Sequence, residues 1–123
     1  NIAITAGGQT AFFLLFNLLA GEFRDGGPRT VLFPLVPEYI GYANQGLSPG
    51  MFRAAEPRLE IRPGHRFKYH VDFDRLEIAN DVAALCVSRP TNPSGNLLTN
   101  DEVHRLDHLA RRAGIPLVID SAY

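Results

Sequence analysis

The sequence predicts an α/β fold, in which a mostly parallel sheet carries helices on both faces. Residues 82–87 and 115–119 are continuous apolar runs, the pattern of strands that are buried on both faces. Between them lies a segment with apolar residues at helical spacing. A strand, a helix and a strand in this order form a βαβ unit, whose strands run parallel with a right-handed crossover. We see no internal repeat or linker, so the chain is read as part of one domain.

The first third of the chain is expected to hold two strands and two helices. Residues 2–5 are rich in β-branched side chains and form the first expected strand. The helix expected over residues 9–23 is apolar on nearly every side, which predicts burial from several directions. Residues 30–33 form the next expected strand, and residues 39–45 form a short helix that ends at Gly46.

The middle of the chain has weaker patterns. Residues 51–55 and 59–62 are strand candidates. Residues 67–73 alternate apolar and polar side chains. This alternation fits either a strand or an extended surface segment.

The last expected helix has clear start and stop signals. The hydroxyl of Thr99 can cap its first turn while Glu102 reaches back, which completes a capping box. Gly114 fits the left-handed stop, and Pro116 prevents continuation. The residue order therefore supports the βαβ unit.

Composition excludes several classes of partner. The formal net charge of the 123 residues is −1, which offers no bulk attraction to nucleic acid or to an anionic membrane. The apolar stretch near the N-terminus is too short to span a bilayer and does not have the layout of a signal peptide. Cys86 is the only cysteine and is expected to be a buried core residue, which suits a reducing, cytoplasmic compartment. No Cys/His spacing suggests a metal site.

Ligands of open α/β sheets bind beyond the carboxyl ends of the strands, and three such ends carry candidate residues. Residues 5–11 (TAGGQTA) turn through glycines into a helix, whose free N–H groups and dipole favour a phosphate. In residues 89–95 (RPTNPSG), Asn92 is held between two prolines. Asp120 is a carboxylate at the end of an apolar run, where it needs a partner.

Each of these features also has a purely structural interpretation. A glycine turn before a helix, a plain proline turn and an Asp that caps a loop would leave the same patterns. If the two strands of the βαβ unit are neighbours, however, Asn92 and Asp120 lie near one another at one edge of the sheet. That convergence favours a shared site.

These motifs resemble those of the fold-type I, class I aminotransferases, and they occur in the same order. The resemblance covers essentially the whole chain. It rests on residues 5–11, on PEY at 37–39, on NPSG at 92–95 and on DSAY at 120–123. It implies a partial large domain, the cofactor-binding one, which is truncated at both ends.

A narrower resemblance points to one branch of this family. That branch moves amino groups between valine and pyruvate. The similar segments are residues 32–35, 37–42, 67–73 and 86–96.

The family resemblance implies pyridoxal 5′-phosphate as the cofactor. Gly8 and Gln9 would then offer backbone N–H groups to its phosphate. Tyr39 would stack on the pyridine ring. Asn92 and Tyr123 would both contact the phenolic oxygen of the ring.

Asp120 and Tyr123 are the catalytic residues that the resemblance implies within this chain. Asp120 would pair with the pyridine nitrogen and keep it protonated, so that the ring draws electrons from the substrate's α-carbon. Arg89 and Tyr42 lie near these motifs and are expected to support the site rather than contact the cofactor.

The resemblance also implies a lysine that forms a Schiff base with the cofactor. In the family it follows the motif found here at 120–123, and this sequence has no residue after Tyr123. Lys68, the only lysine, precedes Asn92 and Asp120 and is expected to be a solvated surface residue. The arginine that binds the substrate carboxylate would also lie further on. We therefore expect the chain alone to be inactive.

We expect the truncation to affect the fold as well as the activity. In the family, the strand that corresponds to residues 2–5 pairs with a strand from further along the chain. We expect residues 2–5 and the apolar helix after them to lack partners here. Exposed apolar surface of that size favours association.

The implied reaction moves an amino group from an aliphatic amino acid, such as valine or alanine, to a 2-oxo acid such as pyruvate. The intact protein is expected to be a homodimer, because the active sites of the family lie at a subunit interface.

Other functions remain open. A carbon–sulfur lyase or a decarboxylase would use the same residues. The aminotransferase-like domain of a transcription regulator would carry a basic helix-turn-helix region before Asn1. A nucleotide-binding doubly wound domain would need the full glycine fingerprint, which is absent.

Overall fold

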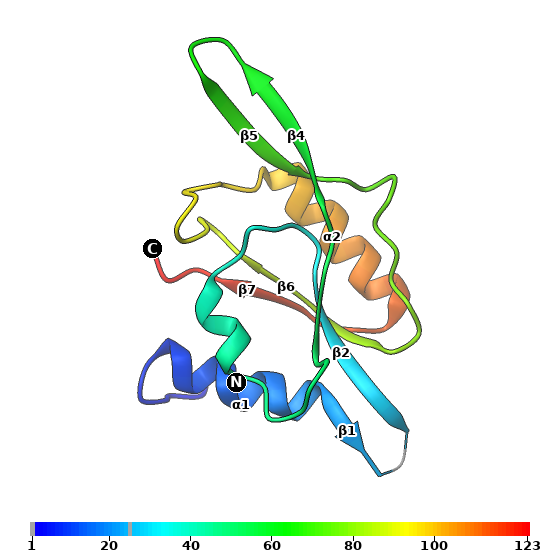
Figure 1. The fold of residues 1–123 in the computed structure, drawn as a ribbon. Helices are drawn as coiled ribbons and strands as arrows, with labels where there is room; N and C mark the ends of the chain where they lie inside the picture. Colours follow the sequence, from blue (N-terminus) through cyan, green and yellow to red (C-terminus); the bar gives the residue numbers. More distant parts are fainter. Residues whose placement is uncertain (1, 25) are drawn as a thin grey trace.

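A computed structural model describes residues 2–24 and 26–123 and shows an α/β arrangement (Figure 1). Within these ranges the main sheet has five strands: β1 (Gly21–Phe23), β2 (Gly27–Phe33), β6 (Val82–Ser88) and β7 (Leu117–Asp120) in that order, with β3 (Phe52–Ala54) also paired to β2. β2 runs parallel to β3 and β6, and β6 runs parallel to β7. β1 is antiparallel to β2. The expected mostly parallel sheet is confirmed.

The α-helices α1 (Gly8–Leu19) and α2 (Asn100–Ala113) cover opposite faces of this sheet. Successive side chains of a strand point to opposite faces. Accordingly, Leu85 and Val87 of β6 pack in one core with Leu106 of α2. Ala84 and Cys86 pack in a second core with Phe16 of α1. Helices on both faces and a buried Cys86 were both expected and are confirmed.

The βαβ unit from β6 through α2 to β7 has the expected boundaries. The side chain of Thr99 accepts a hydrogen bond from the backbone of Glu102 at 3.2 Å, and the Glu102 carboxylate accepts one from the backbone of Thr99 at 2.8 Å. Gly114 ends the helix at φ 69°, in the left-handed region. The parallel register places Ser88 beside Asp120. The carboxyl ends of β6 and β7 therefore meet at one edge of the sheet.

The remaining elements lie before β6. The short 3₁₀ helix η1 (Ile40–Asn44) agrees with the helix expected over residues 39–45. β4 (Pro57–Arg62) and β5 (Arg66–Val71) pair antiparallel as a two-stranded sheet of their own. Figure 1 shows this hairpin projecting from the main body. The alternating segment 67–73 is thus a strand through Val71.

The strand expected over residues 2–5 is not formed. Ile2 and Ile4 are 94% and 95% exposed, and no described strand pairs with this segment. A strand needs a neighbour for its backbone N–H and C=O groups.

The N-terminal helix is shorter and less buried than expected. It ends at Leu19 rather than near Phe23, because Gly21 turns away at φ 121° and starts β1. Its apolar pattern predicted burial from several directions, but in this chain Leu14 and Leu18 are 56% and 71% exposed. The sheet covers one face of the helix, and no described element covers the opposite one. Among the described residues, no helix has the length and apolar character to cross a bilayer.

The final strand also departs from its expected burial. Residues 115–119 were expected to form a strand buried on both faces, but β7 starts at Leu117 and is only partly buried. It lies at the end of the strand order, so one edge of it has no neighbour within the described ranges. Ile119 is 42% exposed as a result.

Candidate functional site

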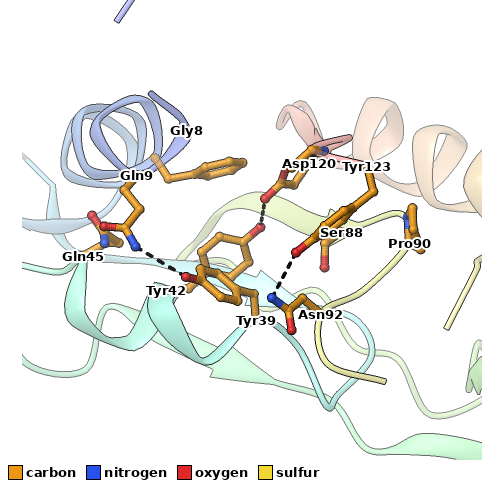
Figure 2. A pocket seen from close by; sticks show the side chains of 12 residues that line it. Gly8, Gln9, Tyr39, Tyr42, Gln45, Ser88, Pro90, Asn92, Asp120 and Tyr123 are labelled. Atoms are coloured by element: carbon orange, nitrogen blue, oxygen red, sulfur yellow. Dashed lines mark hydrogen bonds between the residues drawn. The ribbon is translucent and has the colours of Figure 1, made fainter. Parts of the chain in front are cut away.

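A pocket of about 210 Å³ opens at the carboxyl ends of β6 and β7, where α1 and η1 face them (Figure 2). All six residues proposed from the sequence line it: Gly8, Gln9, Tyr39, Asn92, Asp120 and Tyr123. They come from segments far apart in the chain. The structure therefore brings the predicted motifs together in one place.

The start of α1 forms one end of the pocket. Gly7 has φ 99°, a value that L side chains rarely adopt, and it turns the chain into the helix. The first helical bond runs from the N–H of Ala11 to the carbonyl of Gly7 at 3.1 Å, so the N–H groups of residues 8–10 have no partner within the helix. No side chain caps them, and the first turn has no acidic residue. A Cβ atom added at Gly7 or Gly8 would meet nothing within 4 Å, so the space above them is open. This end suits an anion such as a phosphate.

Tyr39 provides an aromatic wall. Its ring crosses the ring of Tyr42 edge to face, with centroids 5.4 Å apart, and its hydroxyl accepts a bond from the Gln9 amide at 3.4 Å. The ring also lies directly against Gly41, where an added Cβ atom would be 2.3 Å from it. Only glycine leaves room for the ring in this position.

Asp120 lies at the opposite side of the pocket from Gln9 and is held by Tyr42 (Figure 2). The hydroxyl of Tyr42 donates to Oδ2 of Asp120 at 2.5 Å, and the backbone N–H of Ala122 donates to Oδ1 at 3.1 Å. Tyr42 is itself 3% exposed and stacks on Phe33. Burial raises the pKa of the Tyr42 phenol well above its ordinary value, and the bond to Asp120 raises it further. Tyr42 therefore stays protonated and remains a hydrogen-bond donor.

Asn92 and Tyr123 meet directly. The side-chain amide of Asn92 donates to the hydroxyl of Tyr123 at 3.1 Å. We expected both residues to contact the same ligand oxygen, and their contact places two donors side by side at the pocket wall. Tyr123 is 77% exposed, so this wall is open to solvent.

The two residues expected to play supporting roles differ. Arg89 does not line the pocket; its guanidinium donates to the carbonyl of Leu98 at 2.8 Å and to the side chain of Asn100 at 2.6 Å. It braces the loop that carries Asn92. Tyr42 supports Asp120, as expected, but it also lines the pocket.

Lys68 lies outside the pocket, in the β4–β5 hairpin. Its ammonium donates to the carbonyl of Leu97 at 2.6 Å and more distantly to Asn96 at 3.4 Å. Lys68 was expected to be a solvated surface residue; its side chain is half-buried and ties the hairpin to the loop after Asn92. It is not placed to act in the pocket.

Some pocket residues were not proposed from the sequence. Ser88 and Gln45 line the pocket, and Glu38 binds Ser88 behind it. Ser88 ends the apolar run of β6 at the same sheet edge as Asp120. It could have been predicted, because ligands of open α/β sheets bind beyond the carboxyl ends of the strands. Glu38 and Gln45 reach the site through loop geometry, which no local pattern reveals.

The arrangement can bind a flat aromatic ligand that carries a phosphate. The unpartnered N–H groups of α1 suit the phosphate, the Tyr39 ring suits a stacked face, and the Asp120 carboxylate suits a cationic ring nitrogen. Paired donors at Asn92 and Tyr123 suit a ring oxygen. Among the described residues, no group of His, Cys, Asp and Glu is placed to hold a metal ion.

Comparisons with known proteins agree on one family. The sequence profile of class I and II aminotransferases matches residues 55–123. Valine–pyruvate aminotransferase of Escherichia coli (strain K12) is 57% identical over 123 residues, which are 100% of this chain and 30% of that protein. A nicotianamine aminotransferase of Hordeum vulgare is 29% identical over 128 aligned residues, covering 100% of this chain and 21% of that protein.

A solved structure gives the same result. The valine-pyruvate aminotransferase of Salmonella typhimurium LT2 superposes with a TM-score of 0.86 at 53% identity, covering 98% of this chain and 29% of that one. The chain thus spans about a third or less of the length of the relatives that it matches.

Proposed function

The chain belongs to the class I and II aminotransferases, and from that membership we propose that it is part of a pyridoxal-phosphate-dependent enzyme. The proposed reaction moves an amino group from an aliphatic amino acid, such as valine or alanine, to a 2-oxo acid such as pyruvate. Two relatives that are more than half identical to this chain are valine–pyruvate aminotransferases. The observation that carries the proposal is the convergence of Asn92, Asp120 and Tyr123 with the start of α1 in one pocket.

The residues of the pocket fit pyridoxal phosphate. The uncapped N–H groups at residues 8–10, above which no side chain intrudes, would hold its phosphate. Tyr39 would lie on one face of its ring, and Asn92 with Tyr123 would bond its phenolic oxygen. When bound, the cofactor supplies an electron sink for the carbanion that forms on loss of the substrate's α-proton.

Asp120 is the residue of this chain that would act most directly on the cofactor ring. As a carboxylate it would hold a proton on the ring nitrogen, because the ion pair favours the charged form of both partners. Tyr42 would keep one carboxylate oxygen in place through its 2.5 Å hydrogen bond, and Ala122 would hold the other. The carboxylate therefore meets the cofactor already oriented, with little reorganisation.

The pocket is one part of a larger site in this proposal. The lysine that binds the cofactor covalently and the arginine that binds the substrate carboxylate would come from the part of the protein beyond this chain. We assign the chain to the large, cofactor-binding domain.

A homodimer fits the proposal, because α1 carries exposed apolar side chains such as Leu14 and Leu18. A cytoplasmic location fits the lone, buried Cys86.

The test is a product assay with the intact protein. Valine and pyruvate are incubated with it and with pyridoxal phosphate, and both products are quantified. We expect alanine and the 2-oxo acid of valine in equal amounts. Formation of neither, with purified and cofactor-saturated protein, would contradict the proposed reaction.

The same assay separates the alternative reactions. A carbon–sulfur lyase, given a sulfur-containing amino acid in place of valine, would release a thiol, ammonia and a 2-oxo acid without aminating pyruvate. A decarboxylase would release carbon dioxide and an amine. Either product pattern would keep the cofactor site and replace the transamination.

A further inference from the structure

Glu38 forms a connection behind the pocket that the proposed function does not use. It precedes Tyr39 in the loop between β2 and η1. Its carboxylate accepts three hydrogen bonds: from the backbone N–H of Ser88 at 3.0 Å, from the Ser88 hydroxyl at 2.5 Å, and from the backbone N–H of Tyr39 at 3.1 Å. One side chain thus joins the loop of the aromatic wall to the end of β6.

The position of Ser88 gives this connection its importance. Ser88 is the last residue of β6, lines the pocket and lies in register beside Asp120 of β7. A second link runs from the next residue, because the N–H of Arg89 donates to the carbonyl of Asp120 at 2.8 Å. Hydrogen bonds therefore join Tyr39 to Glu38 and Glu38 to Ser88, and the backbone of the next residue, Arg89, is bonded to that of Asp120.

The surroundings of Glu38 argue against a chance surface contact. Ser88 is 4% exposed, and the Glu38 side chain is half-buried. Burial raises the pKa of Glu38, the bonds from Ser88 oppose this rise, and the charge of Asp120 adds to it. The three hydrogen bonds that the Glu38 carboxylate accepts offset the cost of burying it.

No other described contact fixes the backbone of Tyr39 against β6. The ring of Tyr39 contacts Tyr42 and Gly41 of its own loop and helix, and it packs against the core that α1 shares with the sheet. Its hydroxyl accepts a hydrogen bond from Gln9 of α1. The backbone of Tyr39 makes hydrogen bonds to the backbone of Tyr42 and to the side chain of Glu38. The Glu38 bond leads on to Ser88 at the end of β6, whereas the Tyr42 bond leads to Asp120 at the end of β7.

We propose that Glu38 is a positioning residue, which with Ser88 sets the Tyr39 ring relative to Asp120 and so determines how tightly the pocket holds the cofactor ring. The inference rests on the proposed function for the identity of the ligand. The proposed role applies to the protein without ligand as well, because the hydrogen bonds of Glu38 to Ser88 and Tyr39 are present before any ligand binds.

The test measures pyridoxal phosphate binding by the intact protein, through absorbance titration. Glu38→Ala is expected to raise the dissociation constant tenfold or more. Glu38→Gln keeps one oxygen acceptor for Ser88 and is expected to recover part of the loss. Glu22→Ala, a matched change of an exposed carboxylate on β1, is expected to bind like the unmodified protein.

Repeating the Glu38→Ala substitution in the Tyr39→Ala protein distinguishes an effect on the Tyr39 ring from a general loss of stability. If Glu38 acts through Tyr39, then Glu38→Ala added to Tyr39→Ala should change the dissociation constant less than twofold. An equal tenfold loss in both backgrounds would overturn the proposal, as would a Glu38→Ala variant that binds within twofold of the unmodified protein.

A structure of the cofactor-free Glu38→Ala protein decides the question without any binding. The proposal expects the Tyr39 ring to leave its place over Gly41, while Asp120 keeps its bond to Tyr42. An unmoved Tyr39 ring would overturn it. If the unmodified protein did not bind pyridoxal phosphate, the proposed function would fail, and this structure would still decide the role of Glu38.

Discussion

Tyr39 and Gly41 depend on one another at the scale of single residues. A Cβ atom at Gly41 would lie 2.3 and 2.6 Å from two ring carbons of Tyr39 and 2.8 Å from its hydroxyl oxygen. Gly41→Ala should therefore push the ring from the pocket wall. Overpacking of this kind typically costs about 1–3 kcal/mol. We expect about tenfold weaker pyridoxal phosphate binding by the intact protein, measured by absorbance titration.

Gly26→Ala is the matched control for this change. An added Cβ atom there meets only the end of the Arg29 side chain, at 3.2 Å, and that end can move. Gly26 does not line the pocket at α1. Equal binding by Gly41→Ala and the control would refute the role given to the ring position.

The residues of the site were predictable to different degrees. Asn92 and Asp120 were found because each follows an apolar run, and neighbouring parallel strands bring their carboxyl ends together. The direct bond from Tyr42 to Asp120 was not predictable in detail, because it depends on a ring packed against Phe33. The contact of Glu38 with Ser88 was not predictable for a similar reason, because the two residues are far apart in the sequence.

At the scale of elements, the capping box of α2 gives a direct test. Thr99→Ala removes the side-chain acceptor for the N–H of Glu102. We expect the intact protein to lose about 1 kcal/mol of unfolding free energy in urea. Thr99→Ser keeps the hydroxyl and should stay within about 0.5 kcal/mol. Indistinguishable stabilities of the Ala and unmodified proteins would contradict the cap assignment.

The hairpin is joined to α2 through His70. Its two ring nitrogens lie 2.7 Å from a carboxylate oxygen of Glu60 and 3.0 Å from one of Glu102. The bonds from Arg62 and His70 lower the pKa of Glu60 to about 2 from its ordinary 4.5. Burial alone would raise the pKa of Glu102, but bonds from Thr99, His70 and Val71 bring it below its ordinary value.

These lowered values predict how the hairpin responds to acid. A carboxylate whose folded pKa lies below its unfolded pKa adds stability above the unfolded value and loses it as pH falls through the folded value. The hairpin contacts should therefore be complete above pH 4.5 and weaken towards pH 2. Hydrogen exchange of residues 58–71, corrected for intrinsic rates, should show this loss. Constant protection over that range, or the same acid response in Glu60→Gln, would argue against the mechanism.

The elements themselves were largely predictable where their patterns are local. The boundaries of α2 came from Thr99 and Gly114, which act on their own helix. Residues 2–5 failed as a strand because pairing needs a neighbour, and none lies beside them in the described ranges. The expected end of α1 near Phe23 was wrong, because Gly21 at φ 121° leaves the helical path and starts β1.

At the scale of the whole molecule, the isolated chain has a large uncovered apolar surface. Residues Ile2, Ile4, Leu14 and Leu18 are each more than half exposed. Exposed apolar side chains that gather on a surface favour association. We expect the isolated 123-residue chain to self-associate with rising concentration in sedimentation experiments. Leu14→Glu with Leu18→Glu should reduce this association. A stable monomer with strong amide protection of residues 2–5 would contradict the expectation.

The central claim is that Asp120 anchors a pyridoxal phosphate site built from the start of α1, Tyr39 and Asn92. The most direct measurement is the dissociation constant of that cofactor for the intact protein and its Asp120→Asn variant. The account predicts saturable binding that the substitution weakens by about 2–5 kcal/mol, the typical cost of breaking a buried charged pair. Equal binding by both proteins would show that the ring nitrogen does not meet Asp120.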